Sequence, residues 1–355
     1  MKRFLLRLLI FAGFFAGSCE YAQSQVYNNE WINYNNTYYK FKVGATGLYR
    51  ISQATLSSLG LGSTPAEQFQ LWRNGQEISL YTSAQTGPMA GSDYIEFWGE
   101  MNDGKPDNVL YRNTGFQLND KWSLQTDTAA FFLTVNSSGN NLRFVPDIND
   151  VAGNILPPEP YFMHTAGKYY KKALNRGNAA VIVEYVYSSA YDQGEGWAST
   201  DLYSTVTPYP PIYISLPDTQ ANLNVYTGPG APNPYFNINA SGNALNQRQV
   251  VVKLNGDTIV NQTMDFFDYI KTTVPVTIPQ ISSGTANIEI TNNSATQYDR
   301  MVVAKYELVY PRQFNFDNAT NFYFELPANT NGNYLEISNF NYGSTAPVLY
   351  DLTNG

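Results

Sequence analysis

The sequence predicts an all-β protein made of β-sandwich or jelly-roll-like domains with one or two short helices. Short runs that alternate apolar and polar residues recur along the chain between turn-forming residues, as expected for half-buried strands. Hydrophobic residues make up 43% of the 355 residues, and aromatic residues, with 28 tyrosines among them, make up 15%. Aromatic side chains favour strands. Asn-Gly stands between two such runs at Asn74-Gly75 and again at Asn255-Gly256, which predicts tight hairpins.

The first residues have the pattern of an export signal. Three basic residues precede an apolar run over residues 8–16, which is too short to span a bilayer but suits the centre of a signal peptide. We predict a signal peptide over residues 1–24, with lipidation at Cys19 as the open alternative. The protein is therefore expected to be exported, to the outer-membrane surface, the periplasm or the extracellular space.

The composition argues against several classes of function. Basic residues number 21 and acidic residues 29, a net charge of −8, so nucleic acid is not an expected partner. The chain has one cysteine, Cys19, and one histidine, His164, which leaves little material for a metal site or a Cys/His nucleophilic pair. No later stretch approaches the roughly 18 apolar residues of a spanning helix, so no transmembrane segment is expected after the signal peptide.

An N-terminal β-rich domain is predicted over residues 25–160. Its first two strands, 38–43 and 47–51, are separated by a glycine-containing turn and are expected to form a hairpin. Ser52 stands where a helix N-cap is expected, ahead of a short helix over 54–60 that ends at a glycine. Further strands are expected at 69–73, 76–81, 94–98, 130–135 and 142–145.

A proline-rich stretch at 156–160 ends this domain, because proline fixes φ and has no N–H to donate. A connecting segment is expected over 161–211. Within it, residues 168–176 are predicted to form a short basic helix and 181–187 a strand rich in β-branched and aromatic residues. A second proline-rich stretch, 208–211, closes the segment.

A β-sandwich domain is predicted over residues 212–312, where short strands recur between turns. These strands are expected at 213–216, 235–238, 249–254, 258–262, 273–278, 286–290 and 301–310. Residues 313–355 are predicted to carry strands that lead into a missing C-terminal domain, at 322–326, 334–338 and 348–352. The last of them is followed by the first half of a turn, and a turn predicts a return strand.

Three features were weighed as candidate sites. His164 is interpreted as an ordinary residue near a domain boundary, since nothing in the pattern places a triad around it. The segment 93–107 gathers five carboxylates, which raises glycosidase chemistry or a calcium ion, whereas an Asn-Asp-Gly turn needs no ligand. The motif 194–197 presents either a sugar-stacking Trp197 with an acidic Glu195, or a tight turn with a buried indole, which is the favoured interpretation.

Several segments carry a family resemblance when they are taken in order. They are Gly47 to Ile51 with the helix that follows, Phe69 to Gly75, Asp93 to Asp107 with Leu110-Tyr111, Gly194 to Trp197, and Leu349 to Asp351. Together they resemble the N-terminal region of the gingipain-type cysteine peptidases of Bacteroidetes, most closely the PorU-type sortases of the type IX secretion system.

The resemblance implies a non-catalytic β-rich region that precedes a peptidase domain carrying a catalytic His and Cys. His164 and Cys19 match neither catalytic segment, so no catalytic, cofactor-binding or metal-ligating residue is assigned, and a structural calcium ion stays an open alternative. Whether this chain is itself part of an enzyme is also left open. The partners implied are the protein's own C-terminal peptidase domain, with type IX secretion components or cargo proteins. The alternative function is a secreted carbohydrate-binding or adhesion β-sandwich protein with exposed tyrosines.

Overall fold

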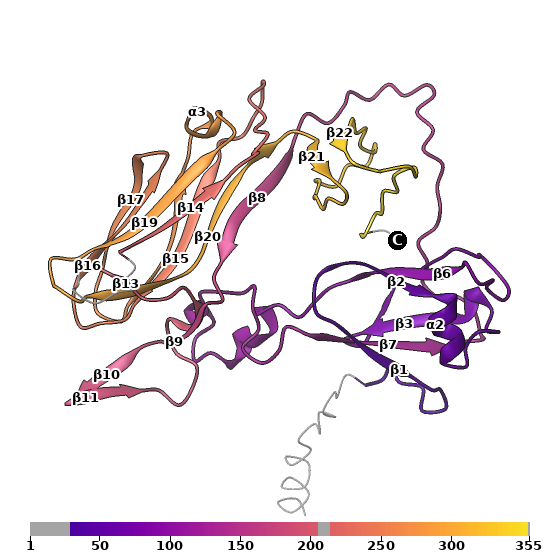
Figure 1. Cartoon of the computed structure of the whole chain (residues 1–355), viewed down its shortest axis with the longest axis horizontal. Helices are drawn as coiled ribbons and strands as arrows, with labels where there is room; N and C mark the ends of the chain where they lie inside the picture. The colour runs from indigo at the N-terminus through magenta and orange to yellow at the C-terminus, as the bar shows by residue number, and fades with distance from the viewer. Residues whose placement is uncertain (1–28, 205–213, 354–355) are drawn as a thin grey trace, which may run out of the picture.

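The computed structural model describes residues 29–204 and 214–353. The predicted signal peptide and Cys19 lie outside the described residues. Most of the described secondary structure is antiparallel strand, joined by two short α-helices and three 3-10 helices, and this confirms the all-β fold class. Two β-sandwiches lie side by side, one in indigo and purple and one in orange (Figure 1). Within these residues, no helix has the length and apolar character needed to cross a membrane.

The N-terminal sandwich consists of a four-stranded and a three-stranded sheet. The first has the order β1 (Tyr39–Val43), β7 (Ala129–Val135), β3 (Phe69–Arg73), β4 (Gln76–Ile78), and the second has the order β2 (Gly47–Ser52), β6 (Tyr94–Gly99), β5 (Tyr81–Thr82). Apolar side chains of both sheets form one buried core, with Phe69, Phe97 and Phe131 fully buried. The alternation along each strand thus places its apolar face between the sheets.

The predictions of the first helix and of the hairpin at Asn74-Gly75 are confirmed. Helix α2 (Gln53–Ser58) is capped by Ser52, whose hydroxyl accepts a hydrogen bond of 3.2 Å from the backbone N–H of Thr55. Strands β3 and β4 pair around Asn74-Gly75, whose φ values of 51° and 79° lie in the left-handed region that Asn and Gly tolerate.

The predicted hairpin of strands 38–43 and 47–51 is wrong. Strand β1 pairs with β7 and β2 pairs with β6, so the two consecutive strands enter opposite sheets. Alternation specifies which face of a strand is buried, but it does not specify the partner strand. The strand predicted at 142–145 is also absent, and an isolated bridge between Leu80 and Arg143 stands there.

The second sandwich also has two antiparallel sheets. One has the order β13 (Leu202–Tyr203), β20 (Arg300–Arg312), β15 (Tyr235–Gly242), β18 (Tyr269–Pro275), with β8 (Phe162–Tyr169) also paired to β20. The other has the order β14 (Ser215–Gln220), β19 (Ala286–Asn293), β16 (Arg248–Leu254), β17 (Asp257–Met264). Their core contains Phe236, Ile290 and Tyr306, and helix α3 (Ile278–Ile281) lies at one end, as seen in Figure 1. The hairpin predicted at Asn255-Gly256 joins β16 to β17.

The helix predicted over residues 168–176 is wrong. Its first residues belong to β8, and its last ones form β9 (Ala173–Arg176), which pairs with β12 (Glu195–Ala198). These residues pair with strands β20 and β12 instead of forming a helix, because tertiary pairing overrides a weak helix preference. The strand predicted at 181–187 is a hairpin, β10 (Ala179–Ile182) and β11 (Glu184–Tyr187).

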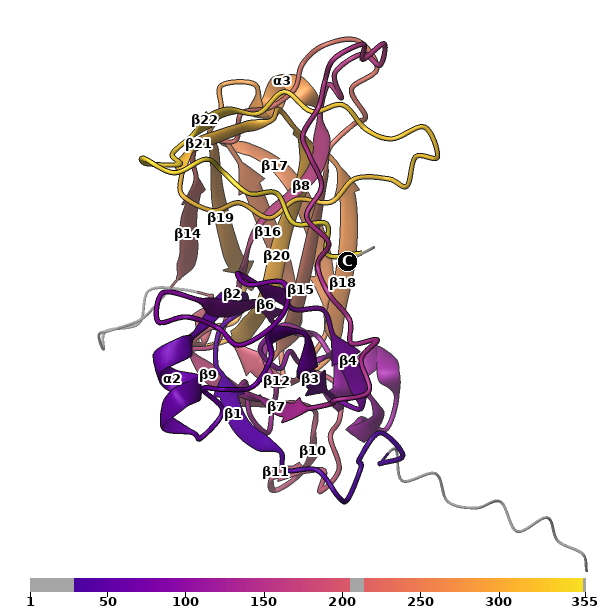
Figure 2. The same ribbon diagram turned by 90° about the vertical axis from the view of Figure 1, so that its right-hand side faces the viewer.

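The C-terminal part of the chain forms a third, aromatic core. Phe162, Phe314 and Phe316 are buried together, and Phe322 and Phe324 pack against them. The strands predicted at 322–326, 334–338 and 348–352 do not form, while β21 (Asn315–Ala319) and β22 (Ser338–Phe340) pair in parallel. The aromatic rings, and not backbone strand pairing, therefore hold residues 322–326 against the rest of the chain. Figure 2 shows the yellow segment beside the second sandwich, above the N-terminal one.

Two 3-10 helices lie in an insertion between β6 and β7, residues 100–128. They are η2 (Lys105–Leu110) and η3 (Thr114–Phe116), and a further one, η1 (Ala66–Gln68), precedes β3. In Figure 1 this β6–β7 insertion lies between the two sandwiches. It belongs to the N-terminal part of the sequence, yet it contacts the second sandwich.

Candidate functional site

His164 lies on β8 among aromatic rings. Its imidazole contacts the rings of Phe162, Tyr310 and Phe322 with centroid distances of 5.7 to 5.8 Å. Burial, together with the nearby Arg312 guanidinium, lowers the pKa of His164 to about 4. The structure therefore places this side chain in the packing of the aromatic core, as a neutral imidazole at neutral pH.

This depressed pKa predicts a pH dependence of stability. An unfolded chain protonates His164 near its ordinary pKa of about 6.5, whereas the folded chain resists protonation until about pH 4. Above pH 6.5 the residue contributes no pH dependence, and between these values acidification favours the unfolded state. We expect the unfolding free energy to lose at most about 1.4 kcal/mol per pH unit through this group.

Urea denaturation between pH 4 and pH 7 measures the effect. The variant His164→Gln should lack this part of the slope, while acidic groups shared by both proteins keep the remainder. Parallel curves of stability against pH for the two proteins would contradict the assignment.

The five carboxylates of residues 93–107 do not converge on one point. Each has its own partner within the fold: Asp93 has Ser83 and the Ala90 N–H, Glu96 has Arg50 and Tyr350, Glu100 has Arg73, Asp103 has Lys105, and Asp107 has the Leu124 N–H. In the part of the chain that the structure describes, no group of three or more His, Cys, Asp or Glu side chains is placed to hold a metal ion. The segment acts through separate capping and pairing contacts.

Trp197 lies on β12, beyond the tight turn at Gly194, where φ is 75°. Its indole N–H donates to the Ser123 carbonyl at 2.9 Å, and the Lys171 ammonium lies 5.4 Å from its ring centroid. The same ammonium lies 4.9 Å from the ring of Trp122 and pairs with Asp127. The ring is therefore engaged in a cation–π contact within the protein, and Trp197 is partly buried, whereas the turn interpretation expected a buried indole.

Glu195, in the same motif, is half-buried. Burial raises the pKa of this carboxyl, and its Oε2 accepts a hydrogen bond of 3.1 Å from the Asp192 N–H. The backbone carbonyl of Glu195 accepts from the Tyr111 hydroxyl at 2.8 Å. These contacts join β12 to the β6–β7 insertion.

The junction between the sandwiches is a feature that the sequence analysis missed. The side-chain amide of Asn119, in the β6–β7 insertion, donates to three carbonyl oxygens of residues that follow the N-terminal sandwich, those of Tyr170, Trp197 and Ala304, at 2.9 to 3.1 Å. Asp120 pairs with Lys305 at 3.0 Å, and although burial opposes it, this ammonium lowers the pKa of Asp120. No local pattern signals these contacts, since the partners lie up to 185 residues away.

The C-terminal segment forms a second link between the two halves. The rings of Trp98 and Tyr323 stack with centroids 5.8 Å apart. The Tyr350 hydroxyl donates to Glu96 at 2.8 Å, and burial beside this carboxylate raises the pKa of Tyr350. The Tyr350 ring also contacts Phe144 at 5.2 Å. Residues after β22 thus return to the N-terminal sandwich.

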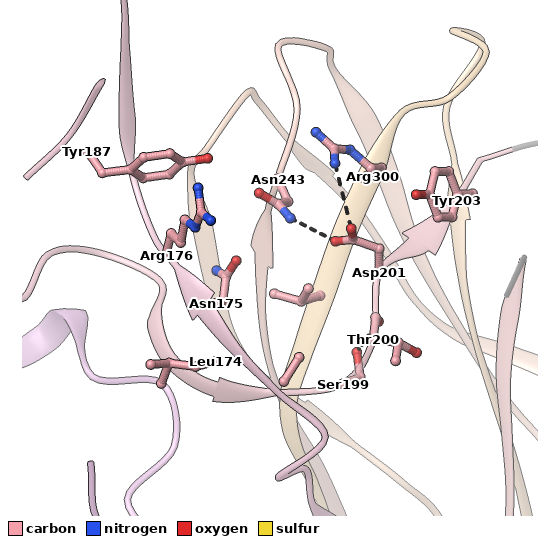
Figure 3. A pocket seen from close by; sticks show the side chains of 12 residues that line it. Leu174, Asn175, Arg176, Tyr187, Ser199, Thr200, Asp201, Tyr203, Asn243 and Arg300 are labelled. Carbon is pink, nitrogen blue, oxygen red and sulfur yellow. Dashed lines mark hydrogen bonds and ion pairs between the residues drawn. The ribbon is translucent and has the colours of Figure 1, made fainter. Parts of the chain in front are cut away.

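A pocket of about 740 Å³ opens beside the hairpin β10–β11. Strand β9 and Tyr187 form one side, and Asp201, Tyr203 and Arg300 form the other (Figure 3). Asn243 lies between them and donates to Asp201 at 2.7 Å, while Arg300 pairs with the same carboxylate at 3.7 Å. This volume is within the range of roughly 300 to 1,000 Å³ that ligand sites occupy.

Nine of the twelve residues that line this pocket have polar side chains. The lining contains two guanidinium groups, one carboxylate, two amides and the hydroxyl groups of serine, threonine and tyrosine. Such groups recognise a polar ligand through directed hydrogen bonds. The sequence analysis did not group them as a site, because they come from five separated stretches of the chain.

Comparisons with known proteins gave structural likenesses of low identity. No family model matches the sequence, and no curated protein matches it. The crystal structure of dimeric latent PorU from Porphyromonas gingivalis aligns with 80% of this chain and 25% of that chain, with a TM-score of 0.47 and 9% identity. This chain therefore spans about a quarter of the length of that protein.

Two carbohydrate-related structures also align. The CBM36-1 domain of a multidomain xylanase from the hindgut metagenome of Trinervitermes trinervoides covers 41% of this chain and 95% of its own, with a TM-score of 0.25 and 12% identity. A β-porphyranase of glycoside hydrolase family 86 from Bacteroides plebeius aligns with 79% of this chain and 37% of its own, with a TM-score of 0.23 and 12% identity.

Proposed function

We propose that this chain is the non-catalytic N-terminal region of an exported, gingipain-like cysteine peptidase of the sortase type that works in type IX secretion. Its role is to hold a peptidase domain and to contact cargo or secretion components. The chemistry of peptide cleavage, by a Cys thiolate and a His, belongs to that separate domain. The proposal extends the sequence resemblance, and one observation on the surface carries it.

That observation is a set of four exposed apolar residues on two segments that contact each other, here called the junction patch: Leu142 and Val145 on one segment, and Val348 and Leu349 on the other. Their exposed fractions are 48%, 74%, 71% and 65%. The two segments that supply them are joined by the ring contact of Phe144 and Tyr350. Apolar side chains gathered on a surface favour contact with another protein surface.

The peptidase domain is the proposed occupant of this patch, and both segments that supply the patch are hydrogen-bonded to the N-terminal sandwich. Residues 142 and 144 make backbone hydrogen bonds with Leu80, and Tyr350 is bonded to Glu96. A docked domain would therefore meet a preformed surface and lose little conformational entropy on binding. The Glu96 carboxylate beneath Tyr350 also pairs with Arg50, which supports a structural role for the acidic segment.

A binding experiment tests the proposal. The chain is mixed with the separately produced peptidase domain of a gingipain-like protein from the same genome, and binding is measured by calorimetry. We expect a complex, and we expect the double variant Val145→Asp, Leu349→Asp to weaken it by about tenfold or more, since a charge is placed in a desolvated interface.

The control variant is Val109→Asp, a valine that is 82% exposed on the β6–β7 insertion and outside the junction patch. It should bind like the wild-type chain. The proposal fails if no complex forms, or if the control weakens binding as much as the double variant does. Hydrolysis of peptides by the chain alone would also contradict a non-catalytic role.

A second candidate function is carbohydrate binding, and the polar pocket beside β10–β11 favours it. Among residues 214–353, the exposed tyrosines of the second sandwich do not form a platform for sugars. Tyr235 begins β15 and Tyr298 precedes β20, and the register of these strands places the two residues at opposite ends. A glycan would therefore bind in the pocket and not on the tyrosines.

A further inference from the structure

The pocket beside β10–β11 carries a positive charge on an acidic protein. Its charged lining residues are Arg176, Asp201 and Arg300, which sum to one positive charge. The whole chain has a net charge of −8. A local positive site in such a chain attracts an anion in preference to a cation.

Of the two arginines that line the pocket, Arg176 is the one without a carboxylate partner. No ion pair joins it to a carboxylate among residues 29–204 and 214–353. Its neighbour across the strand pair, Glu195, turns its carboxylate to the Asp192 N–H. Arg176 is an exposed residue of the pocket lining, and the Tyr187 ring lies 5.4 Å from its guanidinium carbon (Figure 3).

The opposite wall already has its internal charges matched. Asp201 accepts a hydrogen bond from Asn243 at 2.7 Å and pairs with Arg300 at 3.7 Å. This arrangement leaves an ion pair and the Asn243 amide across the cavity from Arg176, while the Asn175 amide lies on the same strand as Arg176 and donates to the Gly194 carbonyl at 2.8 Å (Figure 3). Neutral amides and phenols form directed hydrogen bonds with hydroxyl groups, as a sugar ring requires.

We infer that this pocket binds a carboxylated sugar, a hexuronate unit of an acidic glycan, with its carboxylate on Arg176 and its ring hydroxyls on the amide and hydroxyl groups of the walls. A single carboxylate matches the single positive charge of the pocket. A guanidinium donates two parallel hydrogen bonds to a carboxylate, which makes this contact strong and directional. The inference rests on the second candidate function, carbohydrate binding, and it names the class of glycan.

Calorimetry on the full chain tests the inference with three probes. These are trigalacturonate, the neutral trisaccharide of galactose with the same linkage, and a tri-glutamate peptide. We expect trigalacturonate to bind at least about tenfold more tightly than the other two, because the neutral sugar lacks the carboxylate and the peptide lacks the ring hydroxyls.

The variant Arg176→Gln should reduce the affinity for trigalacturonate to that for the neutral sugar. The matched control is Lys253→Gln, which removes one positive charge from an exposed position on β16. This control should leave the affinity unchanged, and equal melting temperatures of the three proteins show that the fold is retained.

Each other outcome identifies what is wrong. Equal binding of the acidic and neutral sugars by wild type and Arg176→Gln would overturn the carboxylate assignment and retain carbohydrate binding. Equal binding of tri-glutamate would show a general anion site and overturn the sugar assignment. Binding of no probe would overturn both the inference and the second candidate function.

Discussion

Replacing Asp299 with alanine should lower the melting temperature of the second sandwich by about 6 to 20 °C. Asp299 and Arg248 form an ion pair whose side chains are both fully buried. The guanidinium donates to both carboxylate oxygens, at 2.7 and 2.9 Å. Removal of one partner leaves a buried charge without compensation, which costs about 3 to 5 kcal/mol.

The surroundings of this pair explain why the cost is not relieved by rearrangement. Arg248 also donates to the carbonyl oxygens of Ala244, Asn246 and Phe266, so it closes the loops at this end of the sandwich. A Cβ on Gly242 would collide with the Phe266 carbonyl and with the Arg248 guanidinium. Asn243, which lines the pocket, directly follows Gly242. The buried ion pair therefore also supports the backbone at one wall of the pocket.

Differential scanning calorimetry measures the effect. The control is Asp257→Ala, an exposed carboxylate at the β16–β17 turn, which should shift the melting temperature by less than about 2 °C. An unchanged melting temperature for Asp299→Ala would show that the buried pair contributes nothing to the stability of the sandwich.

Replacing Asn119 with leucine should uncouple the two sandwiches. The two amide hydrogens of Asn119 serve three carbonyl oxygens, so one hydrogen is shared. Leucine has a similar volume but cannot donate. The Ala304 carbonyl keeps its hydrogen bond from the Tyr170 N–H, and each buried carbonyl that is left unsatisfied costs about 1 to 3 kcal/mol. We expect a single thermal transition in the wild-type chain and two separate transitions in the variant.

Small-angle scattering gives an independent measure, since a loosened junction increases the radius of gyration. The matched control is Asn149→Leu, at an exposed asparagine of the segment that joins the sandwiches. It should leave both the transition and the scattering unchanged. If Asn119→Leu behaves like this control, the link through the C-terminal segment is sufficient to hold the sandwiches together.

The local features of the fold were predictable because they depend on few residues. Asn74-Gly75 and the Ser52 cap each use backbone conformations and hydrogen bonds within a few positions of the chain. The all-β class follows from alternation in the same way. The sequence analysis interpreted His164 as an ordinary residue near a domain boundary, and the structure places its imidazole against the rings of Phe162 and Tyr310.

The candidate pocket could not be predicted. Arg176 was assigned to a helix, and Arg300 and Asp201 lie 99 positions apart in the chain. Their proximity requires that β13 pairs with β20, and β9 with β12, which are long-range choices of partner. The burial of Arg248 could not be predicted either. In the sequence it is a polar residue at the start of a strand, which is also the pattern of an exposed arginine.

The amino-acid sequence alone therefore determines the turns, the cap and the buried face of each strand, since these are set by φ preferences and by alternation over a few residues. Tertiary structure decides which strands pair, where the β6–β7 insertion docks and which charges meet in the pocket. The physical reason is that many partners satisfy the same alternation, and only the joint packing of both sheets and the hydrogen bonding of every buried polar group select one of them.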